Sequence, residues 1–512
     1  MAALSIPILA AAALAFFAIR RSQAPMPAEQ SFALAPKRAL EARLSYGPAD
    51  RYRPYDTARA SVASAAQDVP LAVMAHLEAK KDVGALAAAY LLRGEPDHAA
   101  GVLEKAPQDP DLDTMRSVVE LERGHVEEAL VMLDSVLDRA PGHVQARWNR
   151  GLALEALGLS TSAASAFEAV AAKEDPGWKV EAIQRASSLR ARIQELQQSW
   201  HDARQAGESL LARGEPFPLP LARRFPGIVR LFFYDAVRVA PSRESLRFLT
   251  PLAGELDAIT GGNILSQHLR AAETRDFAGR ARLAEEYARM ALAASPPSPE
   301  ALKDFVVRAQ RAKAPDLVMG ALVQGGEEGG KQYQALAEKT GDPWFLALSA
   351  HGRARREIEA GRVNHAEILL LAELENCGKS GIPFRCTMME LTLAELYSSE
   401  HRLVEALAAA KRGLQLARGG NEWALETWFI QEMGNIARLR NGLALARAFL
   451  DEALERQPED CSVKNYVHGS LAMIHLWQNR VTSARREASL APRCGPPLSL
   501  HDASPDFRKT ET

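Results

Sequence analysis

The sequence predicts an all-α solenoid of helical hairpins, preceded by one transmembrane helix at the amino terminus. In seven places an Ala stands five residues after a Gly or polar turn residue, and the spacing of these Ala residues is regular. In the first group they lie 30 and 34 positions apart, and in the second group 40, 40 and 38 apart. Such a period is typical of helical-hairpin repeats, which bury a core by stacking on their neighbours. The seven pairs are Gly94/Ala99, Gly124/Ala129, Gly158/Ala163, Gly361/Ala366, His401/Ala406, Asn441/Ala446 and Asn479/Ala484.

The composition also favours helices and disfavours nucleic acid as a partner. Ala and Leu are abundant, aromatic residues make up 6% of the chain and charged residues 25%. Ala, Leu, Arg and Glu are strong helix formers. The formal net charge of -2 gives no global positive field that would hold a phosphate backbone.

The amino terminus carries an uncharged apolar segment, residues 2–19, followed at once by Arg20 and Arg21. Eighteen apolar residues are near the lower limit for crossing a bilayer. We therefore expect a transmembrane anchor over residues 1–21. Since the basic residues all follow the segment, the positive-inside rule places the body in the cytoplasm. The alternatives are a signal sequence or an anchored body that is exported.

The remainder of the chain divides by composition and period. Residues 22–65 mix Pro, Ser, Gln and charges with little apolar period, which predicts a disordered linker. Four prolines within residues 216–226 forbid a continuous helix there. We expect solenoid segment 1 over 66–214, an irregular helical middle over 215–350, solenoid segment 2 over 351–492 and a disordered tail over 493–512.

One repeat unit, residues 144–177, shows the physical logic of the hairpin most clearly. A Gly in the turn permits positive φ between the two helices, and an Ala at their crossing lets the backbones approach. Large residues fill the apolar stripe, and a Pro ends the second helix. In chain order the residues are Trp148, Gly151, Gly158, Ala163, Phe167 and Pro176.

These residues resemble the tetratricopeptide repeat (TPR) family over about residues 80–177 and 355–491. The resemblance implies a concave face lined by four positions of each first helix. Those side chains either recognise a partner peptide or pack between hairpins, and both interpretations stay open. The two-carboxylate clamp of some family members is not expected, because Asn149 and Lys179 alone match it. The face is formed by Gln145, Trp148, Leu152 and Glu155 in one unit and by Trp428, Gln431, Asn435 and Arg438 in another.

The four cysteines show no CxxC and no ligand-like grouping. We expect free thiols in the helical hairpins. The alternative is a bond between Cys377 and Cys386, which are near enough in sequence to pair across a loop.

One constellation suggests an enzyme. His351 is followed by Gly and precedes Cys386, which resembles the dyad of caspase-like peptidases with CHAT domains. Such a dyad needs the imidazole beside the thiolate, normally at the ends of parallel strands. The segments around both residues have a helical pattern instead, so we do not expect the dyad. The twelve His residues include no HExxH, and we expect no metal, no cofactor and no small-molecule substrate.

The prediction for function is therefore a membrane-tethered, non-catalytic scaffold or adaptor. Solenoids present long concave surfaces, and we expect this one to bind a protein or peptide partner there, with the membrane contacted through residues 2–19. The alternatives are a truncated or degenerate CHAT-type peptidase relative, and an envelope assembly factor with an exported body.

Overall fold

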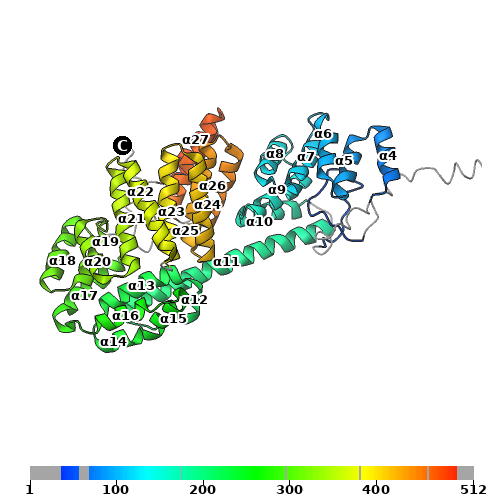
Figure 1. Cartoon of the computed structure of the whole chain (residues 1–512). Coiled ribbons are helices and arrows are strands. Elements are labelled where there is room, and N and C mark those ends of the chain that lie inside the picture. Colours follow the sequence, from blue (N-terminus) through cyan, green and yellow to red (C-terminus); the bar gives the residue numbers. More distant parts are fainter. Residues whose placement is uncertain are drawn as a thin grey trace, which may run out of the picture. The chain divides into compact units, whose positions relative to one another are not determined.

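The computed structural model of the chain describes residues 36–56, 69–173, 176–293, 297–379, 382–457 and 460–492 (Figure 1). This part is helical and contains no β-sheet, which confirms the predicted all-α class; one parallel bridge joins Arg38 and Tyr55. The predicted membrane anchor, residues 1–21, and the predicted tail, residues 493–512, lie outside the described residues. Among the described helices, none combines the length and apolar character that a bilayer crossing requires.

The chain divides into two compact units, residues 1–190 (unit 1) and residues 191–512 (unit 2). The helices of unit 1 form successive antiparallel hairpins, and the last of them continues into unit 2. They are α4 (Leu71–Lys80), α5 (Val83–Leu92), α6 (Pro96–Glu104), α7 (Pro110–Glu122), α8 (Val126–Arg139), α9 (Val144–Ala156), α10 (Ser160–Ala171) and α11 (Pro176–Arg213).

Unit 2 begins with helices of 6 to 15 residues, here called short, and ends with hairpins whose helices mostly have 17 residues. The short ones are α12 (Leu219–Arg224), α13 (Pro226–Val239), α14 (Arg243–Phe248), α15 (Thr250–Thr260), α16 (Ile264–Ala272), α17 (Phe277–Ala291), α18 (Pro299–Arg311), α19 (Pro315–Gln324) and α20 (Lys331–Thr340). The hairpins are α21 (Pro343–Glu359), α22 (Val363–Lys379), α23 (Pro383–Ser399), α24 (Leu403–Gly419), α25 (Trp423–Leu439), α26 (Leu443–Arg456), α27 (Cys461–Trp477) and α28 (Val481–Leu490).

The hairpin joints confirm the predicted turn and crossing residues. All seven turn residues have positive φ, from 56° at Asn479 to 79° at Gly124. The Ala five residues later is fully buried in six pairs, and Ala484 is 3% exposed. Gly and Asn adopt the left-handed region at the lowest cost, and a small side chain lets two helices approach closely. The longer period of the second group follows from helix length, because α21 to α25 have 17 residues each whereas α7 to α10 have 12 to 14.

The proline-rich stretch interrupts the helices as predicted. α11 ends at Arg213, and α13 starts at Pro226, where a missing N–H costs nothing. The N-terminus of α13 meets the start of α25, because the Glu422 carboxylate accepts hydrogen bonds from the backbone N–H groups of Gly227 and Ile228. Burial dominates over these bonds and raises the pKa of Glu422 to about 8.

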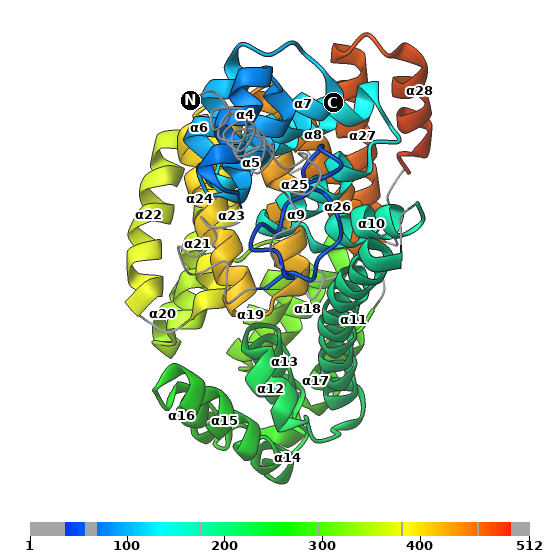
Figure 2. The same cartoon turned by 90° about the vertical axis from the view of Figure 1, so that its right-hand side faces the viewer.

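The prediction of a disordered linker over 22–65 is wrong for residues 36–56. Leu40, Ala42, Leu44 and Ala49 are at most 9% exposed and belong to one hydrophobic core with α4 to α7. Figure 2 shows the segment in dark blue, a non-helical loop against the helices of unit 1. The apolar side chains that were too few to form a core alone are buried against a preformed one.

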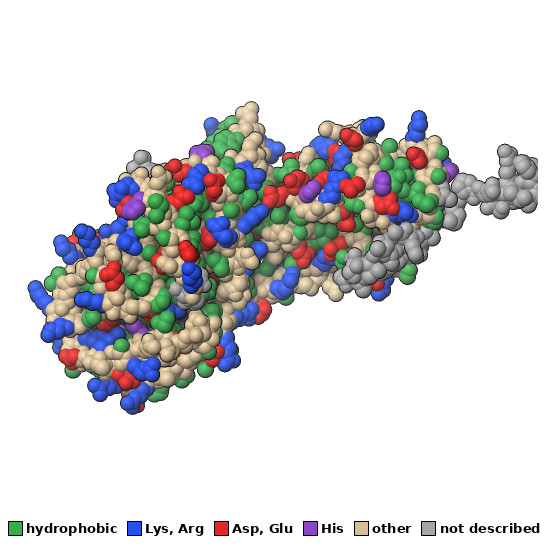
Figure 3. Space-filling model, in the orientation of Figure 1, with side chains coloured by type: hydrophobic (Ala, Val, Ile, Leu, Met, Phe, Trp, Pro, Cys, Tyr) green, Lys and Arg blue, Asp and Glu red, His purple; other side chains and the backbone are tan. Residues whose placement is uncertain are grey.

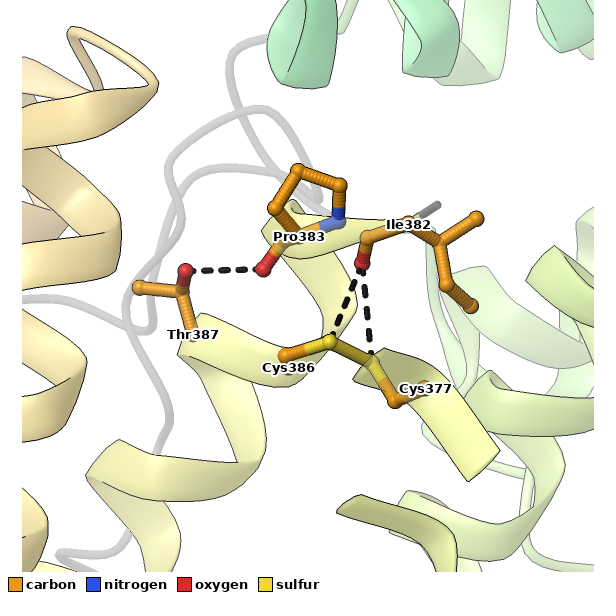
Figure 4. The surroundings of a disulfide bond; sticks show 5 residues. All are labelled: Cys377, Ile382, Pro383, Cys386 and Thr387. Atoms are coloured by element: carbon orange, nitrogen blue, oxygen red, sulfur yellow. Dashed lines mark hydrogen bonds between the residues drawn. A yellow bond between two sulfur atoms is a disulfide. The ribbon is translucent and has the colours of Figure 1, made fainter. Parts of the chain in front are cut away.

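The prediction of free thiols is also wrong. Cys377, near the end of α22, is bonded to Cys386 in the first turns of α23, with 5.7 Å between the Cα atoms (Figure 4). Cys461 is disulfide-bonded as well. The Ile382 carbonyl oxygen lies 3.6 Å and 3.5 Å from the two bonded sulfur atoms. The bond closes the turn between α22 and α23 and therefore fixes the angle at which one hairpin follows another.

Candidate functional site: a groove occupied by the chain's own loop

Residues 38–56, hereafter the N-terminal loop, form a closed loop with paired ends. The Arg38 N–H donates to the Pro54 carbonyl and the Asp56 N–H to the Arg38 carbonyl, both at 3.0 Å. Inside the loop, the Arg43 guanidinium binds the Asp50 carboxylate with an Nη2–Oδ2 distance of 2.5 Å. Both side chains are less than a tenth exposed. These two buried charges therefore neutralise each other within the loop, and neither needs a partner from the groove for that purpose.

Asn149 on α9 binds the main chain of the loop in both directions. Its Oδ1 accepts the backbone N–H of Arg43 and its Nδ2 donates to the Arg43 carbonyl, each at 2.8 Å. The side chain is fully buried. A carboxamide carries one acceptor and one donor group, so it can replace a neighbouring strand for a single residue. Asn149 therefore recognises the extended backbone of the loop and makes no use of the Arg43 side chain in these two hydrogen bonds.

Two indole rings hold the loop on either side of that contact. The Trp148 Nε1–H donates to the Glu41 carbonyl at 3.1 Å, and the Trp178 Nε1–H to the Asp50 carbonyl at 3.1 Å. The rings meet edge to face with 5.0 Å between their centroids. The guanidinium carbons of Arg38 and Arg43 lie 4.5 Å and 4.1 Å from the Trp178 ring centroid. Cation–π contacts of buried guanidinium groups are favourable because little water competes for the charge.

Charge complementarity completes the groove. The Arg38 guanidinium binds the Glu181 carboxylate through two hydrogen bonds of 2.9 Å and 2.5 Å. Arg185 forms an ion pair with Glu41 of the loop, and its Nη1 lies 3.6 Å from the Glu155 carboxylate. The bidentate pair of Arg38 and Glu181 fixes both the position and the orientation of the guanidinium group. The groove therefore accepts an arginine beside α11 and a carboxylate beside Arg185.

The structure brings the predicted residues of α9 onto the surface that meets the loop. Gln145 Nε2 donates to Asp50 at 2.9 Å, and Trp148 contacts Glu41. Leu152 is half-buried and packs on the core that the loop completes. Glu155 is linked to the loop through Arg185, since that guanidinium lies between the carboxylates of Glu155 and Glu41.

The sequence did not point to the residues that α11 contributes to this groove, Trp178, Glu181 and Arg185. One signal was present, because Trp178 stands 30 positions after Trp148, close to the period of the array. Asn149 was noted for a clamp that binds carboxylates, whereas here it binds backbone amide groups.

The four predicted residues of α25 lie in a network that joins neighbouring hairpins. Trp428 and Gln431 are 6% and 5% exposed, so they offer little surface to a partner. Asn435 donates to the Glu432 carboxylate at 3.3 Å, and Arg438 donates to Asn435 at 2.6 Å. For these residues the packing interpretation accounts for the contacts.

Glu432 is the centre of that network. Its Oε1 accepts a 2.5 Å hydrogen bond from Ser398 on α23, and burial raises the pKa of the carboxyl group to about 7. The Arg438 guanidinium lies 5.3 Å from the Trp477 ring centroid on α27. The network thus connects the first helices of three consecutive hairpins.

The dyad considered for a peptidase is not formed. The His351 Nε2 lies 2.7 Å from Thr392 Oγ1, and burial lowers the pKa of His351 to about 3. Cys386 is held in the disulfide, so no thiolate is available there. Within the described residues, no group of three or more His, Cys, Asp or Glu side chains has the arrangement of a metal site.

These joints and contacts define the fold as a solenoid of tetratricopeptide-like hairpins. No family model matches the chain, and no curated protein does. Among solved structures, the chain is similar to the one named "Crystal structure of APC/C hetero-tetramer Cut9-Hcn1". The identity is 11%, 82% of this chain and 88% of that chain are covered, and the TM-score is 0.22. So low a score carries no argument, and the fold rests on the turn geometry and packing described above.

Proposed function

We propose that this protein is a non-catalytic scaffold that binds an extended peptide segment of a protein partner in the groove between α9 and α11. The observation that carries the proposal is the pair of hydrogen bonds between Asn149 and the backbone of Arg43. Two further hydrogen bonds, from Trp148 and Trp178, also end on backbone carbonyls. A groove with several fixed donors and acceptors for main-chain atoms suits peptide recognition.

In this proposal the N-terminal loop is the resident ligand of the groove, and a partner segment replaces it. The loop also indicates the preferred side chains. An arginine at the place of Arg38 meets Glu181, and a carboxylate at the place of Glu41 meets Arg185. Replacement lets the partner regain hydrogen bonds that the loop gives up, so the exchange costs little beyond ordering the incoming segment.

We propose further that residues 2–19 tether the scaffold to a membrane. Tethering raises the local concentration of the groove near membrane-bound partners and adds avidity without new contacts. The support for the tether is the uncharged apolar segment followed by Arg20 and Arg21. A fusion that lacks residues 2–19 should move from the membrane fraction to the soluble fraction.

The disulfides favour a second candidate, an envelope assembly factor whose body is exported. Cys377 is bonded to Cys386, and disulfides persist in oxidising compartments but are rare in the cytosol. Alkylation of intact cells before lysis tests this topology. Cysteines that react only after reduction support an exported body, and cysteines that react at once support a cytoplasmic one.

The peptide-binding proposal is tested with the full chain opened next to the loop. A site for a specific protease is inserted between residues 57 and 68, the chain is cleaved, and a fluorescent peptide of residues 36–56 is added in excess. We expect the peptide to exchange with the cleaved fragment and to give saturable anisotropy. Asn149→Ala should weaken its binding by about 30-fold or more, because two buried backbone groups lose their partner at a cost of about 2–4 kcal/mol.

The matched control is Asn364→Ala, which removes an exposed amide on α22. It should leave peptide binding unchanged. The proposal fails if the released protein stays helical by circular dichroism yet binds no peptide. It also fails if Asn149→Ala binds the peptide as tightly as the unmodified groove does.

A further inference from the structure

A cavity of about 810 Å³ lies within unit 2, apart from the groove described above. Its wall is formed by α16, the start of α17, the turn between α18 and α19, and the turn between α20 and α21. Figure 3 shows the molecule hollowed in the region of these helices, with Lys and Arg side chains at the wall. The volume falls in the range of about 300–1,000 Å³ that is usual for small-molecule sites.

The wall carries five cationic side chains and three carboxylates. The carboxylates are already engaged. Asp316 lies 3.2 Å from Arg275 and 2.6 Å from Arg280, Asp342 accepts a hydrogen bond from the Tyr234 hydroxyl, and Asp276 caps α17. The cations are Arg238, Arg275, Arg280, Lys313 and Lys339.

Two of these cations stand at the solvent side without a carboxylate. Lys313 and Lys339 are exposed, and within the described residues neither has an ion-pair partner. They come from two different turns, and both belong to the cavity wall. An anion in the cavity would be attracted by both, in addition to the arginines deeper in the wall.

Arg280 supplies unused hydrogen-bond donors deeper in the wall. Its residue is 4% exposed, and its Nη2 donates to the Arg238 carbonyl at 2.9 Å and to Asp316 at 2.6 Å. Its Nε and Nη1 have no hydrogen-bond partner. Buried guanidinium donors are costly to leave unpaired, and a ligand oxygen or a water molecule relieves that cost.

The pKa values of two groups in the wall also indicate a positive electrostatic potential in the cavity. The pKa of His268 is lowered to about 3, first by burial and then by Arg275 and Arg238. The pKa of Arg275 is lowered to about 10, again first by burial, with Arg280 and Arg238 acting in the same direction. Cations that depress one another's pKa mark a region where negative charge is stabilised.

The cavity also has an apolar side, formed by Ile264, Met319, Leu336 and Phe345. A simple inorganic ion would leave this surface in contact with water. A ligand with an apolar body and acidic groups at its periphery satisfies both parts of the wall.

We propose that this cavity binds a small organic anion in which carboxylate or phosphate groups are attached to an apolar body. The proposal goes beyond the scaffold function, since it involves a different site and a different class of ligand. The excess positive charge and the free donors select the anion, and the apolar side selects its carbon skeleton. The volume limits the ligand to a small molecule.

The test is calorimetric titration of the full chain in a chloride buffer without phosphate or sulfate. The probes are isophthalate, phenyl phosphate and the neutral isophthalamide. We expect one or both anions to bind with one site per chain and the amide to give no binding. The anion that binds more tightly shows whether the acidic group is a carboxylate or a phosphate. The affinity for the anions should fall as salt rises from about 20 to about 500 mM, because salt screens the attraction of the exposed lysines.

The diagnostic variant is the double substitution Lys313→Asn/Lys339→Gln. Lys313 has a φ of 52°, where Asn is well tolerated, so neither change should disturb folding. We expect affinity for the anions to fall about tenfold at low salt, since two attractive charges at the mouth of the cavity are removed. Lys331→Gln, at the other end of α20 and outside the cavity wall, is the matched control and should bind normally.

The proposal is overturned if neither anion binds, if isophthalamide binds as well as isophthalate, or if the double variant retains full affinity. An acidic hexapeptide is titrated in parallel. Binding of the peptide without either small anion would overturn the proposal in favour of a protein ligand. None of these outcomes depends on the groove of unit 1, so this proposal and the scaffold proposal fail separately.

Discussion

Replacement of Asn149 by Ala is the most informative single perturbation of this protein. The Asn149 amide is fully buried, and both its hydrogen bonds, each 2.8 Å long, go to the backbone of Arg43. Ala would leave one N–H and one C=O group buried without a partner. Each such group costs about 1–3 kcal/mol. Since the loop can shift to hydrate part of this pair, we expect unit 1 to lose about 2–4 kcal/mol of unfolding free energy.

Two assays measure the effect of Asn149→Ala. Urea unfolding followed by tryptophan fluorescence reports on both units, and two of the seven Trp residues, Trp148 and Trp178, lie in the groove. Trypsin reports on the loop, because cleavage after the buried Arg43 requires the loop to leave the groove. The control Asn364→Ala should stay within about 0.5 kcal/mol of the unmodified protein. The reasoning is refuted if Asn149→Ala is equally stable and the bond after Arg43 stays resistant.

Three further predictions follow from local geometry. A Cβ on Gly177 would lie 2.2 Å from the Tyr52 ring, so Gly177→Ala should lower the melting temperature, although Ala favours helix over Gly by about 1 kcal/mol. The control Gly101→Ala should raise the melting temperature, because its Cβ meets nothing within 4 Å. The pKa of Glu422, raised from 4.5 to about 8, means that the folded state binds this proton more tightly, so its stability contribution is lost as pH rises from about 5 to 8. Glu422→Gln should flatten that decline in unfolding measured at pH 5, 6.5 and 8. Cys377→Ser opens a loop with a sequence separation of nine and should cost about 2–3 kcal/mol. A reductant should destabilise the unmodified protein more than the variant, in which only the bond of Cys461 is left to reduce.

The hairpins could be predicted because their signals are local. The turn requires one residue that tolerates positive φ, and the crossing of the two helices requires one small residue. Both occur in the sequence at a regular spacing. His401, Asn441 and Asn479 confirm that the turn needs a tolerated left-handed conformation and not Gly as such.

The N-terminal loop could not be predicted because its order comes from distant partners. Its sequence resembles a linker, with prolines, many charges and little apolar period. Asn149 and Arg43 are 106 positions apart, and Glu181 and Arg38 are 143 apart. Since no local pattern encodes such pairs, composition alone gave the wrong answer for residues 36–56.

The disulfide and the cavity illustrate the same limit. Cys377 and Cys386 can pair because the chain turns back between α22 and α23, which spacing allowed but did not require. The cations of the cavity come from separate helices and turns between Arg238 and Lys339, and only the fold gathers them. On α25, periodicity selected one face of the helix but could not distinguish buried packing from an open surface.

Amide hydrogen exchange at Arg43 tests the central claim most directly, since that claim is that the groove of unit 1 holds an extended backbone. If Asn149 binds Arg43 as described, this amide should exchange as slowly as the core amides of α9, and the protection should disappear in Asn149→Ala. Exchange of Arg43 in the unmodified protein within seconds, as in an unstructured peptide, would show that the loop does not occupy the groove and would contradict the peptide-binding proposal.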